Sequence, residues 1–348
     1  MAAVIFPCQE RFASLIIVFM KNLNEDIKTG QFKQVYLLYG EEAYLKKQYK
    51  TRLTKAIIPE GDTMNYSYYE GKNISVPEII DLAETMPFFA AHRLIVVENS
   101  GFFKTASPEL ADYIKAMPDT VIFLFVETEV DKRGKLYKAV KEKGRIVEMG
   151  MQDEKTLLLW IASAVKRENK KIQESTVRYL ISKAGTDMEN LEKELEKLFS
   201  YTVFKDEITI QDVEDICTTQ ITNRIFDMVD AVAKKQQKKA LDYYYDLVAL
   251  KEPPLRILAL LTRQFRILLE VKELMRKGLG RQQIAQSAGL HPYVAGKCMD
   301  QSKGFSGWQI RNILEDAADM EEAAKTGRLD STMCVEIFIV KYSTDGSS

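Results

Sequence analysis

Short apolar runs alternate with helical patterns of apolar and polar residues between positions 34 and 149. Five of these runs are rich in β-branched and aromatic residues, which favours strands. They are QVYLLYG, MNYSYYEG, RLIVVEN, TVIFLFVE and RIVEM, at 34–40, 64–71, 93–99, 120–127 and 145–149. Between them, the stretch 75–86 has helical spacing and begins with Ser75 as an N-cap and Glu78 three residues later. Continuous apolar strands separated by helices predict a mostly parallel sheet covered on both faces.

The pattern becomes helical after about Gly150. In LRILALLTRQFRILLEVKELM, apolar residues fall on one helical face and most of the basic residues lie elsewhere. The segment 330–342 is ambiguous, because its β-branched residues favour a strand whereas Asp330 and Ser331 would cap a helix. A chain of 348 residues is too long for one ordinary core. We therefore predict four parts: an extension that is either absent from the native protein or dispensable, an α/β domain, a small helical domain and a larger helical domain, at 1–20, 21–150, 151–221 and 222–345.

Charge is distributed unevenly along a chain whose net charge is −1. From Lys234 to Arg311 there are 15 Lys and Arg against 6 Asp and Glu, so this stretch carries +9 and the remainder −10. A basic stretch inside a neutral protein is a feature of polyanion-binding surfaces, and equally of solvated helix faces. Composition alone leaves both interpretations open.

Residues able to form a catalytic or metal site are sparse. The four cysteines are scattered without a CxxC pair, and the two histidines lie far apart in the sequence, so neither a zinc site nor a Cys/His catalytic pair is expected. No nucleophile, base or metal constellation is present, and we predict no active site, no metal and no cofactor. The apolar run at 13–19 is too short to span a bilayer, and unpaired thiols fit the reducing cytoplasm.

The order of a sheet domain followed by helical units is that of an AAA+-type ATPase module. Such a module needs a phosphate loop, G-x-x-x-x-G-K-[ST], directly after its first strand. Here the strand continues into Gly40, Glu41 and Glu42, and the two carboxylates would repel a triphosphate. Glu98 ends a later strand, like the metal-binding acid of the second ATPase motif, but it has no first motif to act with. The sequence predicts an AAA+-like scaffold that does not bind nucleotide.

Four apolar residues, Met86, Pro87, Phe88 and Phe89, lie together at the predicted exit of the helix at 75–86. A connection of this kind is normally polar, and adjacent loop residues seldom both reach the core. Aromatic residues at the ends of elements are usually buried. Taken alone, the residues favour core packing, with an exposed partner-binding site as the alternative.

A series of soft motifs in fixed order resembles the delta subunit of the bacterial DNA polymerase III clamp loader. The motifs are VYLLYGEEAYLKK, AETMPFFAAHRLIVVEN, AGTDMENLEKELEKL, LTRQFRILLEVKEL, GLHPYVAGK and KTGRLD. The resemblance runs from about residue 34 to the C-terminus. It implies a DNA replication protein that binds the ring-shaped sliding clamp and holds one of its interfaces open. It also implies a C-terminal collar that joins the other clamp-loader subunits, of the delta-prime and gamma or tau types, over primed DNA.

The resemblance reverses the preference at the four apolar residues. In that family a short hydrophobic wedge before the third strand ends in two large apolar residues, and Phe88 and Phe89 occupy those positions. Pro87 replaces the small polar residue that usually precedes the pair, and Phe-Phe replaces Leu-Phe, so the fit to the partner's pocket could differ. The same resemblance places DNA near the collar, with the contact candidates Tyr293, Lys297, Lys325 and Arg328.

Two other function classes fit the sequence less well. Residues 281–302 have the Ile-Ala-x-x-x-Gly-Leu spacing of a helix-turn-helix, which would indicate a DNA-binding regulator. Its second helix offers only Lys297, beside Gly296 and Asp300, which is poor for groove contacts. An enzyme in its own right is not expected, and a DNA-directed DNA polymerase (nucleotidyltransferase) label would belong to the whole polymerase assembly.

Overall fold

The computed structural model describes residues 22–344. The chain divides into two compact units, Met1–Gln152 and Asp153–Ser348. The predicted extension at 1–20 lies outside the described residues. The predicted boundary at 221 lies within the second unit and stays a prediction. Across residues 22–344, no helix combines the length and the apolar character that crossing a bilayer requires.

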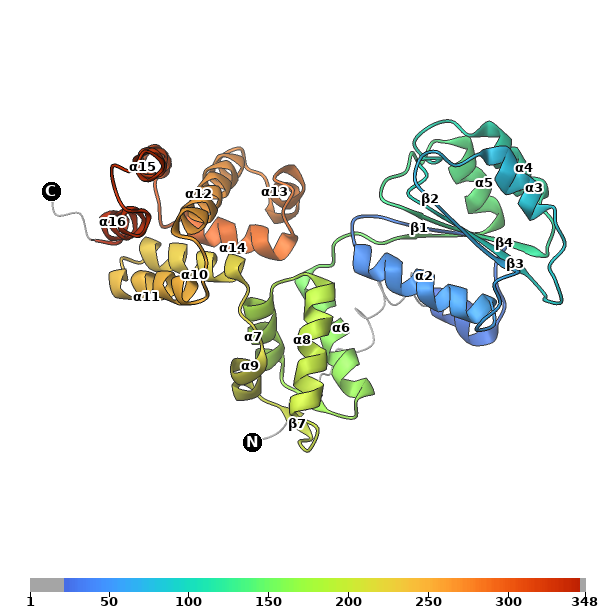
Figure 1. Ribbon diagram of the computed structural model, residues 1–348, viewed down its shortest axis with the longest axis horizontal. Helices are drawn as coiled ribbons and strands as arrows, with labels where there is room; N and C mark the ends of the chain where they lie inside the picture. Colours follow the sequence, from blue (N-terminus) through green and yellow to red (C-terminus); the bar gives the residue numbers. More distant parts are fainter. Residues whose placement is uncertain (1–21, 345–348) are drawn as a thin grey trace. The chain divides into compact units, whose positions relative to one another are not determined.

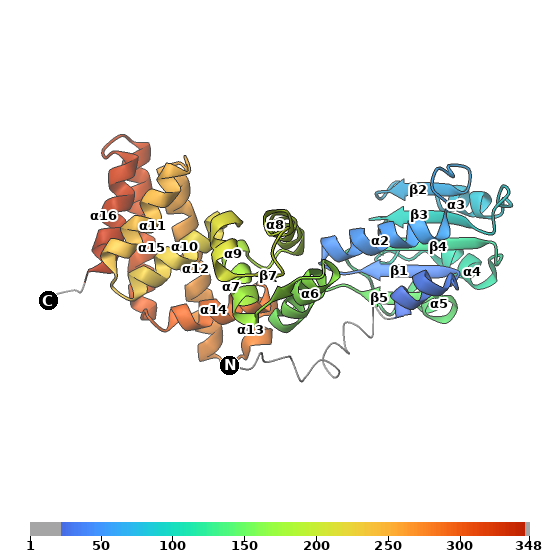
Figure 2. The same cartoon turned by 90° about the horizontal axis from the view of Figure 1, so that it is seen from below.

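The first unit contains a five-stranded sheet in which neighbouring strands are parallel, as predicted. Its strands lie in the order β2-β3-β4-β1-β5 (Figure 2). They are β1 (Val35–Tyr39), β2 (Tyr66–Glu70), β3 (Arg93–Glu98), β4 (Val121–Glu127) and β5 (Arg145–Glu148). Each strand lies within the run of sequence that predicted it. The central strands β1, β3 and β4 are buried over almost their whole length, because helices cover both faces.

Helices cover the two faces of this sheet unequally (Figure 1). On one face lies α2 (Ala43–Ile57), which buries Leu45, Tyr49 and Leu53. On the other lie α3 (Val76–Ala83), α4 (Pro108–Ala116) and α5 (Lys135–Lys143). Successive side chains of a strand point to opposite faces of the sheet. Val35, Leu37 and Tyr39 of β1 therefore share one face and pack on the side of α3, α4 and α5. A short helix over residues 22–29 precedes β1.

The second unit is helical apart from one pair of very short parallel strands, among the residues described. Its first part contains α6 (Glu154–Arg167), β6 (Lys171–Ile172), α7 (Glu174–Ala184), α8 (Met188–Tyr201), β7 (Glu207–Ile208) and α9 (Ile210–Ile216). Its second part contains α10 (Ile221–Ala233), α11 (Gln237–Ala249), α12 (Pro254–Arg276), α13 (Arg281–Ser287), α14 (Pro292–Ser302), α15 (Gly307–Lys325) and α16 (Ser331–Ser343). The ambiguous segment at 330–342 is therefore a helix, and Asp330 caps it by accepting from the backbone N–H groups of Thr332 and Met333.

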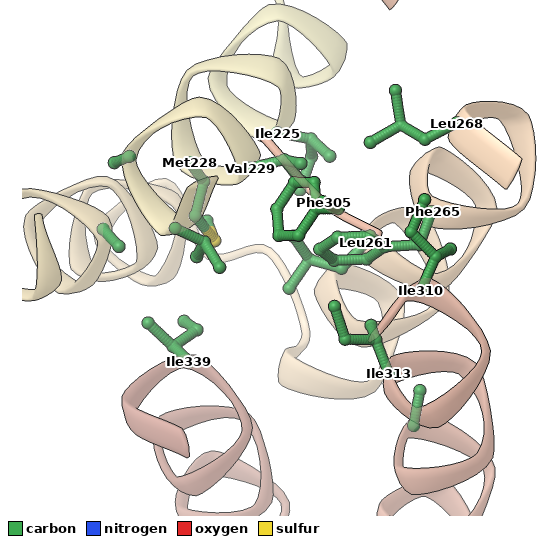
Figure 3. Packing of buried hydrophobic residues seen from close by; sticks show 14 of the residues in the cluster. Ile225, Met228, Val229, Leu261, Phe265, Leu268, Phe305, Ile310, Ile313 and Ile339 are labelled. Carbon is green, nitrogen blue, oxygen red and sulfur yellow. The ribbon is translucent and has the colours of Figure 1, made fainter. Parts of the chain in front are cut away.

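The long helix α12 organises the second part of this unit. It packs against α10, α14, α15 and α16. The edge of the Phe305 ring meets the Phe265 ring at a centroid distance of 5.4 Å, surrounded by aliphatic side chains from the neighbouring helices (Figure 3). The apolar face predicted for 255–275 is thus the centre of a continuous core.

Candidate partner-binding site

The loop between α3 and β3 presents the four residues singled out in the sequence. Phe89 is 95% exposed, Met86 74% and Phe88 56%, while Pro87 is half-buried. The two phenyl rings meet edge to face at a centroid distance of 4.6 Å. The loop precedes a strand of a parallel sheet, so the pair lies at the edge formed by the strands' amino ends. Residue type alone favoured core packing at Phe88 and Phe89, and that prediction is wrong for both.

A fourth exposed apolar side chain in this region was not predicted. Met64, 62% exposed, lies in the loop before β2, and its carbonyl is linked to the wedge loop through a shared hydrogen-bond donor, Arg93. The strands β2 and β3 pair directly, so the loops that precede them are neighbours. We call Met64, Met86, Phe88 and Phe89 the wedge surface. Met64 could not be assigned to this surface from the sequence, because the assignment depends on the pairing of β2 with β3.

Buried polar side chains hold this loop from beneath. The Asn65 side-chain oxygen accepts from the Phe88 N–H at 2.7 Å, and its amide nitrogen donates to the Phe88 carbonyl at 2.8 Å. The Arg93 guanidinium donates to the carbonyls of Thr85, Met64 and Met86 at 3.2–3.4 Å. Hydrogen bonds from Asn65 hold the pKa of the Asp62 carboxyl below its usual value. The backbone of the wedge is therefore fixed while its side chains face solvent.

The opposite, carboxyl edge of the sheet is the place where a nucleotide would bind in an ATPase-like scaffold. Here its polar groups bond to each other. The N–H of Gly40 donates to the Glu127 carbonyl at 3.2 Å, and the amine of Lys46 donates to the same carbonyl at 3.2 Å. The Glu127 carboxylate accepts from the Ser100 N–H at 3.0 Å. Burial raises the pKa of Glu127 and lowers that of Lys46. Glu98, the residue compared with a metal-binding acid, is ion-paired with Lys50.

Three of the four residues predicted to contact DNA lie on helices, and Arg328 lies in the loop after α15. Tyr293 and Lys297 are half-buried in α14, with the amine of Lys297 5.0 Å from the centre of the Tyr293 ring. Lys325 ends α15 and is ion-paired with Glu321, and Arg328, just beyond it, is ion-paired with Glu322. These acidic partners reduce the local positive charge. The residues predicted as contacts are thus divided into two pairs in different surroundings.

The helix-turn-helix interpretation of residues 281–302 agrees with the secondary structure, because α13 and α14 are two helices joined by a short turn. However, α14 packs against α12, α13 and α10. Asp300 is its one exposed residue, and an acid repels the DNA backbone. A recognition helix must instead present several side chains to a groove. The packing therefore argues against a sequence-reading role.

Comparisons with known proteins agree over nearly the whole chain. Residues 36–150 match the family model "DNA polymerase III, delta subunit", and residues 222–342 match the model of that subunit's C-terminal domain. DNA polymerase III subunit delta of Bacillus subtilis is 29% identical over 91% of this chain and 95% of its own length. A probable DNA polymerase III subunit delta of Aquifex aeolicus is 22% identical over 88% of this chain and 90% of its own length.

A solved structure gives the same result for the fold. The Bacillus subtilis DNA clamp loader delta protein superimposes with a TM-score of 0.78 and 27% identity, over 93% of this chain and 99% of that one. The predicted fold class, an AAA+-like sheet domain followed by helical domains, is confirmed by this match together with the parallel sheet described above.

Proposed function

Because the chain belongs to the family of DNA polymerase III delta subunits, we propose that it binds the sliding clamp through the wedge surface and opens or holds open the ring for loading onto primed DNA. The observation that carries this proposal is the exposure of Phe88 and Phe89 on a loop whose backbone is fixed. Large aromatic side chains that project from a rigid support are typical anchors for a pocket on a partner.

The free-energy cost of exposing two aromatic rings supports the same proposal. Leaving two aromatic rings in water forgoes burial free energy of roughly 2 kcal/mol per ring. The loop nevertheless keeps them exposed, and the buried side chains of Asn65 and Arg93 beneath it fix its backbone. A fixed loop loses less conformational entropy on docking, so more of the burial free energy appears as affinity.

The test is clamp binding by a variant with Phe88→Ala and Phe89→Ala. We expect the affinity for purified clamp to fall at least about 100-fold, which corresponds to roughly 2.7 kcal/mol for two anchor residues. The melting temperature should stay unchanged, because exposed side chains contribute little to stability. Surface plasmon resonance and circular dichroism measure the two quantities.

A matched control tests whether any exposed phenylalanine would have the same effect. Phe204, fully exposed between α8 and β7, belongs to the other compact unit. Phe204→Ala should leave clamp affinity unchanged. Equal losses in the control and the double variant, or a large loss of melting temperature with binding intact in the double variant, would contradict the proposed site.

We further propose that the second part of the helical unit joins the other clamp-loader subunits. Exposed apolar side chains gather where α11 meets α16, namely Tyr245, Met333 and Ile337. The hydroxyl of Tyr245 donates to Glu336 at 2.9 Å and so fixes one of them. The preceding residue, Tyr244, is fully buried and therefore serves helix packing instead. Replacing Ile337 with Asp should weaken assembly with the other subunits while clamp binding persists.

Contact with DNA through Tyr293, Lys297, Lys325 and Arg328 remains part of the proposal. The charge of Lys325 and Arg328 is shared with neighbouring glutamates, so we expect each to contribute less than an unpaired cation would. Binding of the assembled complex to primed DNA of any sequence, with equal affinity, would support this role over that of a sequence-specific regulator.

A further inference from the structure

We propose that Asn65 is a positioning residue that, with Asp62 and Arg93, holds the wedge in its binding conformation before any partner arrives. The inference rests on the proposed function, because it concerns how the same wedge is presented. None of these three side chains belongs to the exposed wedge surface, and Asn65 and Arg93 are buried. Their effect on binding would therefore act through the loop backbone.

The side chain of Asn65 forms the two backbone hydrogen bonds that a neighbouring strand would otherwise form with the wedge. It bonds both the N–H and the carbonyl of Phe88, as a paired backbone residue would in a sheet. It lies 23 positions earlier in the sequence, so this contact fixes the wedge loop onto the start of β2. The backbone carbonyl of Asn65 also accepts from the N–H of Leu94 at 2.8 Å, which ties the same residue to the strand that follows the wedge.

Asn65 is itself held by Asp62. One carboxylate oxygen of Asp62 accepts from the N–H groups of Met64 and Asn65, each at 3.0 Å. The other accepts from the Asn65 side-chain amide at 2.7 Å. The amide group is therefore oriented from both sides, since its oxygen can face only the Phe88 N–H while its nitrogen donates to Asp62 and to Phe88.

Arg93 supports the same loop at two further points. It is a buried cation whose guanidinium donates to carbonyls on both sides of the wedge, in the loop before β2 and in the segment that leaves α3. Its own N–H is held by the Thr120 carbonyl at 2.8 Å. We call Asp62, Asn65 and Arg93 the latch.

The backbone at Phe89 shows why a latch is needed. Its φ is +48°, a left-handed conformation that a bulky residue seldom adopts. Such a conformation persists only where surrounding contacts impose it. The bonds to the adjacent Phe88 supply that constraint, and the turn they impose places the Phe89 ring almost wholly in solvent.

Loss of the latch should lower affinity by lowering the fraction of molecules whose wedge is ready to bind. Apparent affinity falls in proportion to that fraction. If the released loop holds the binding conformation about one tenth of the time, the clamp dissociation constant rises about tenfold. The exposed side chains that contact the clamp are unchanged in such a variant.

The experiment uses the full chain with Asn65→Ala and, as a second variant, the isosteric Asn65→Asp. Asp keeps an acceptor for the Phe88 N–H and loses both donations of the amide. Two readouts are taken: hydrogen exchange of the peptide covering 84–92 in the free protein, and affinity for purified clamp. Asn73→Ala, an exposed asparagine in the same unit, is the control. Each substitution is also made together with Phe89→Ala.

We expect faster exchange in 84–92 and about tenfold weaker binding for both Asn65 variants, with Asn73→Ala unchanged. The affinity lost with Asn65→Ala should be smaller when Phe89 is already alanine, because one of the side chains that the latch positions is then absent. A general loss of folding would weaken binding equally in both backgrounds.

Three results would overturn the proposal. Unchanged exchange in 84–92 would show that Asn65 does not hold the loop. Faster exchange with wild-type affinity would show that holding the loop is irrelevant to binding, and so would an equal loss of affinity in both backgrounds. Wild-type affinity for Phe89→Ala combined with Phe88→Ala would instead refute the proposed function, while the exchange measurement would still decide whether Asn65 holds the loop.

Discussion

At the carboxyl edge of the five-stranded sheet, polar groups bond to one another, whereas at the amino edge apolar side chains face solvent. The first edge is closed by the contacts of Gly40, Lys46 and Glu127. At the second, polar groups hold the backbone from below and leave Phe88 and Phe89 exposed. Both edges contain buried charged or polar side chains, so the difference lies in what those side chains support.

This contrast is what the proposed protein-binding role would require of an AAA+-like scaffold. In open α/β sheets, ligands bind outside the carboxyl ends of the strands. In this chain the backbone N–H groups of Gly40, Glu42 and Ser100 at that edge already donate to other groups of the protein. Substitutions at the closed edge should therefore change stability, and substitutions at the wedge should change binding.

The largest effect on stability is expected for Gly40→Ala. A methyl group at this position would lie 2.2 Å from the Met149 carbonyl oxygen, and the φ of +129° is unfavourable for any side chain. We expect the free energy of unfolding of the first unit to fall by about 3 kcal/mol, since backbone strain and a clash act together. Urea denaturation measures this loss.

Gly71→Ala separates the effect of backbone strain on stability from the effect of a steric clash. Its φ is +93°, and an added methyl group would meet no atom within 4 Å. We expect it to lose about half as much stability as Gly40→Ala, because only the backbone conformation is unfavourable. Clamp affinity of the folded fraction should be unchanged in both variants. A selective loss of affinity in Gly40→Ala would remove the distinction between the two edges.

A smaller effect, confined to the wedge edge, is expected from pH. The Asp62 carboxyl has a lowered pKa, with hydrogen bonds from Asn65 as the largest cause. A lowered pKa gives stabilisation that is complete above the unfolded value of about 3.9 and is lost as pH falls through the folded value. The wild-type loop should therefore stay fixed down to about pH 4 and loosen below it. Methyl NMR of Met64 and Met86 would report this change.

In Asn65→Asp, the order of the wedge loop should change with pH in the opposite direction, between neutral pH and about pH 5. A second carboxylate beside Asp62 raises the pKa of one member of the pair, because like charges disfavour ionisation. The variant loop should be loosest at neutral pH and become more ordered as one proton is taken up. The same direction of change in both proteins would mean that the pair does not control the loop.

Much of the fold could be predicted from the sequence because its signals are local. Each of the five strands coincided with a β-branched or aromatic run, and Ser75 caps α3 by accepting from the N–H of Glu78. The segment at 330–342 was undecided because β-branched composition and capping disagreed. Capping was the better guide there, since Cys334, Val335, Phe338 and Ile339 are buried at helical spacing.

The candidate site could be predicted only in part. The exposed pair followed from a resemblance, whereas the residues alone favoured burial. Asn65 and Arg93 were missed because their role depends on contacts that join β2 to the loop before β3, which no local pattern encodes. Two weak signals existed. Asp62 precedes Asn65 at the spacing of a side-chain-capped turn, and Arg93 stands directly before a run of four apolar strand residues.

The smallest expected effect is the response to ATP, which should be none. A phosphate loop binds through free backbone N–H groups and a lysine that reaches the phosphates. Here the N–H of Gly40 donates to Glu127, that of Glu42 donates to Met149, and Lys46 is buried against the Glu127 carbonyl. Opening this edge would break these bonds and bring phosphate beside Glu98 and Glu127.

Calorimetry should show no saturable heat, and ATP should not shift the unfolding midpoint, because a ligand without affinity for the folded state adds no stability. Saturable binding that disappears in Lys46→Met would show that the carboxyl edge is a ligand site and that the contrast between the two edges is wrong.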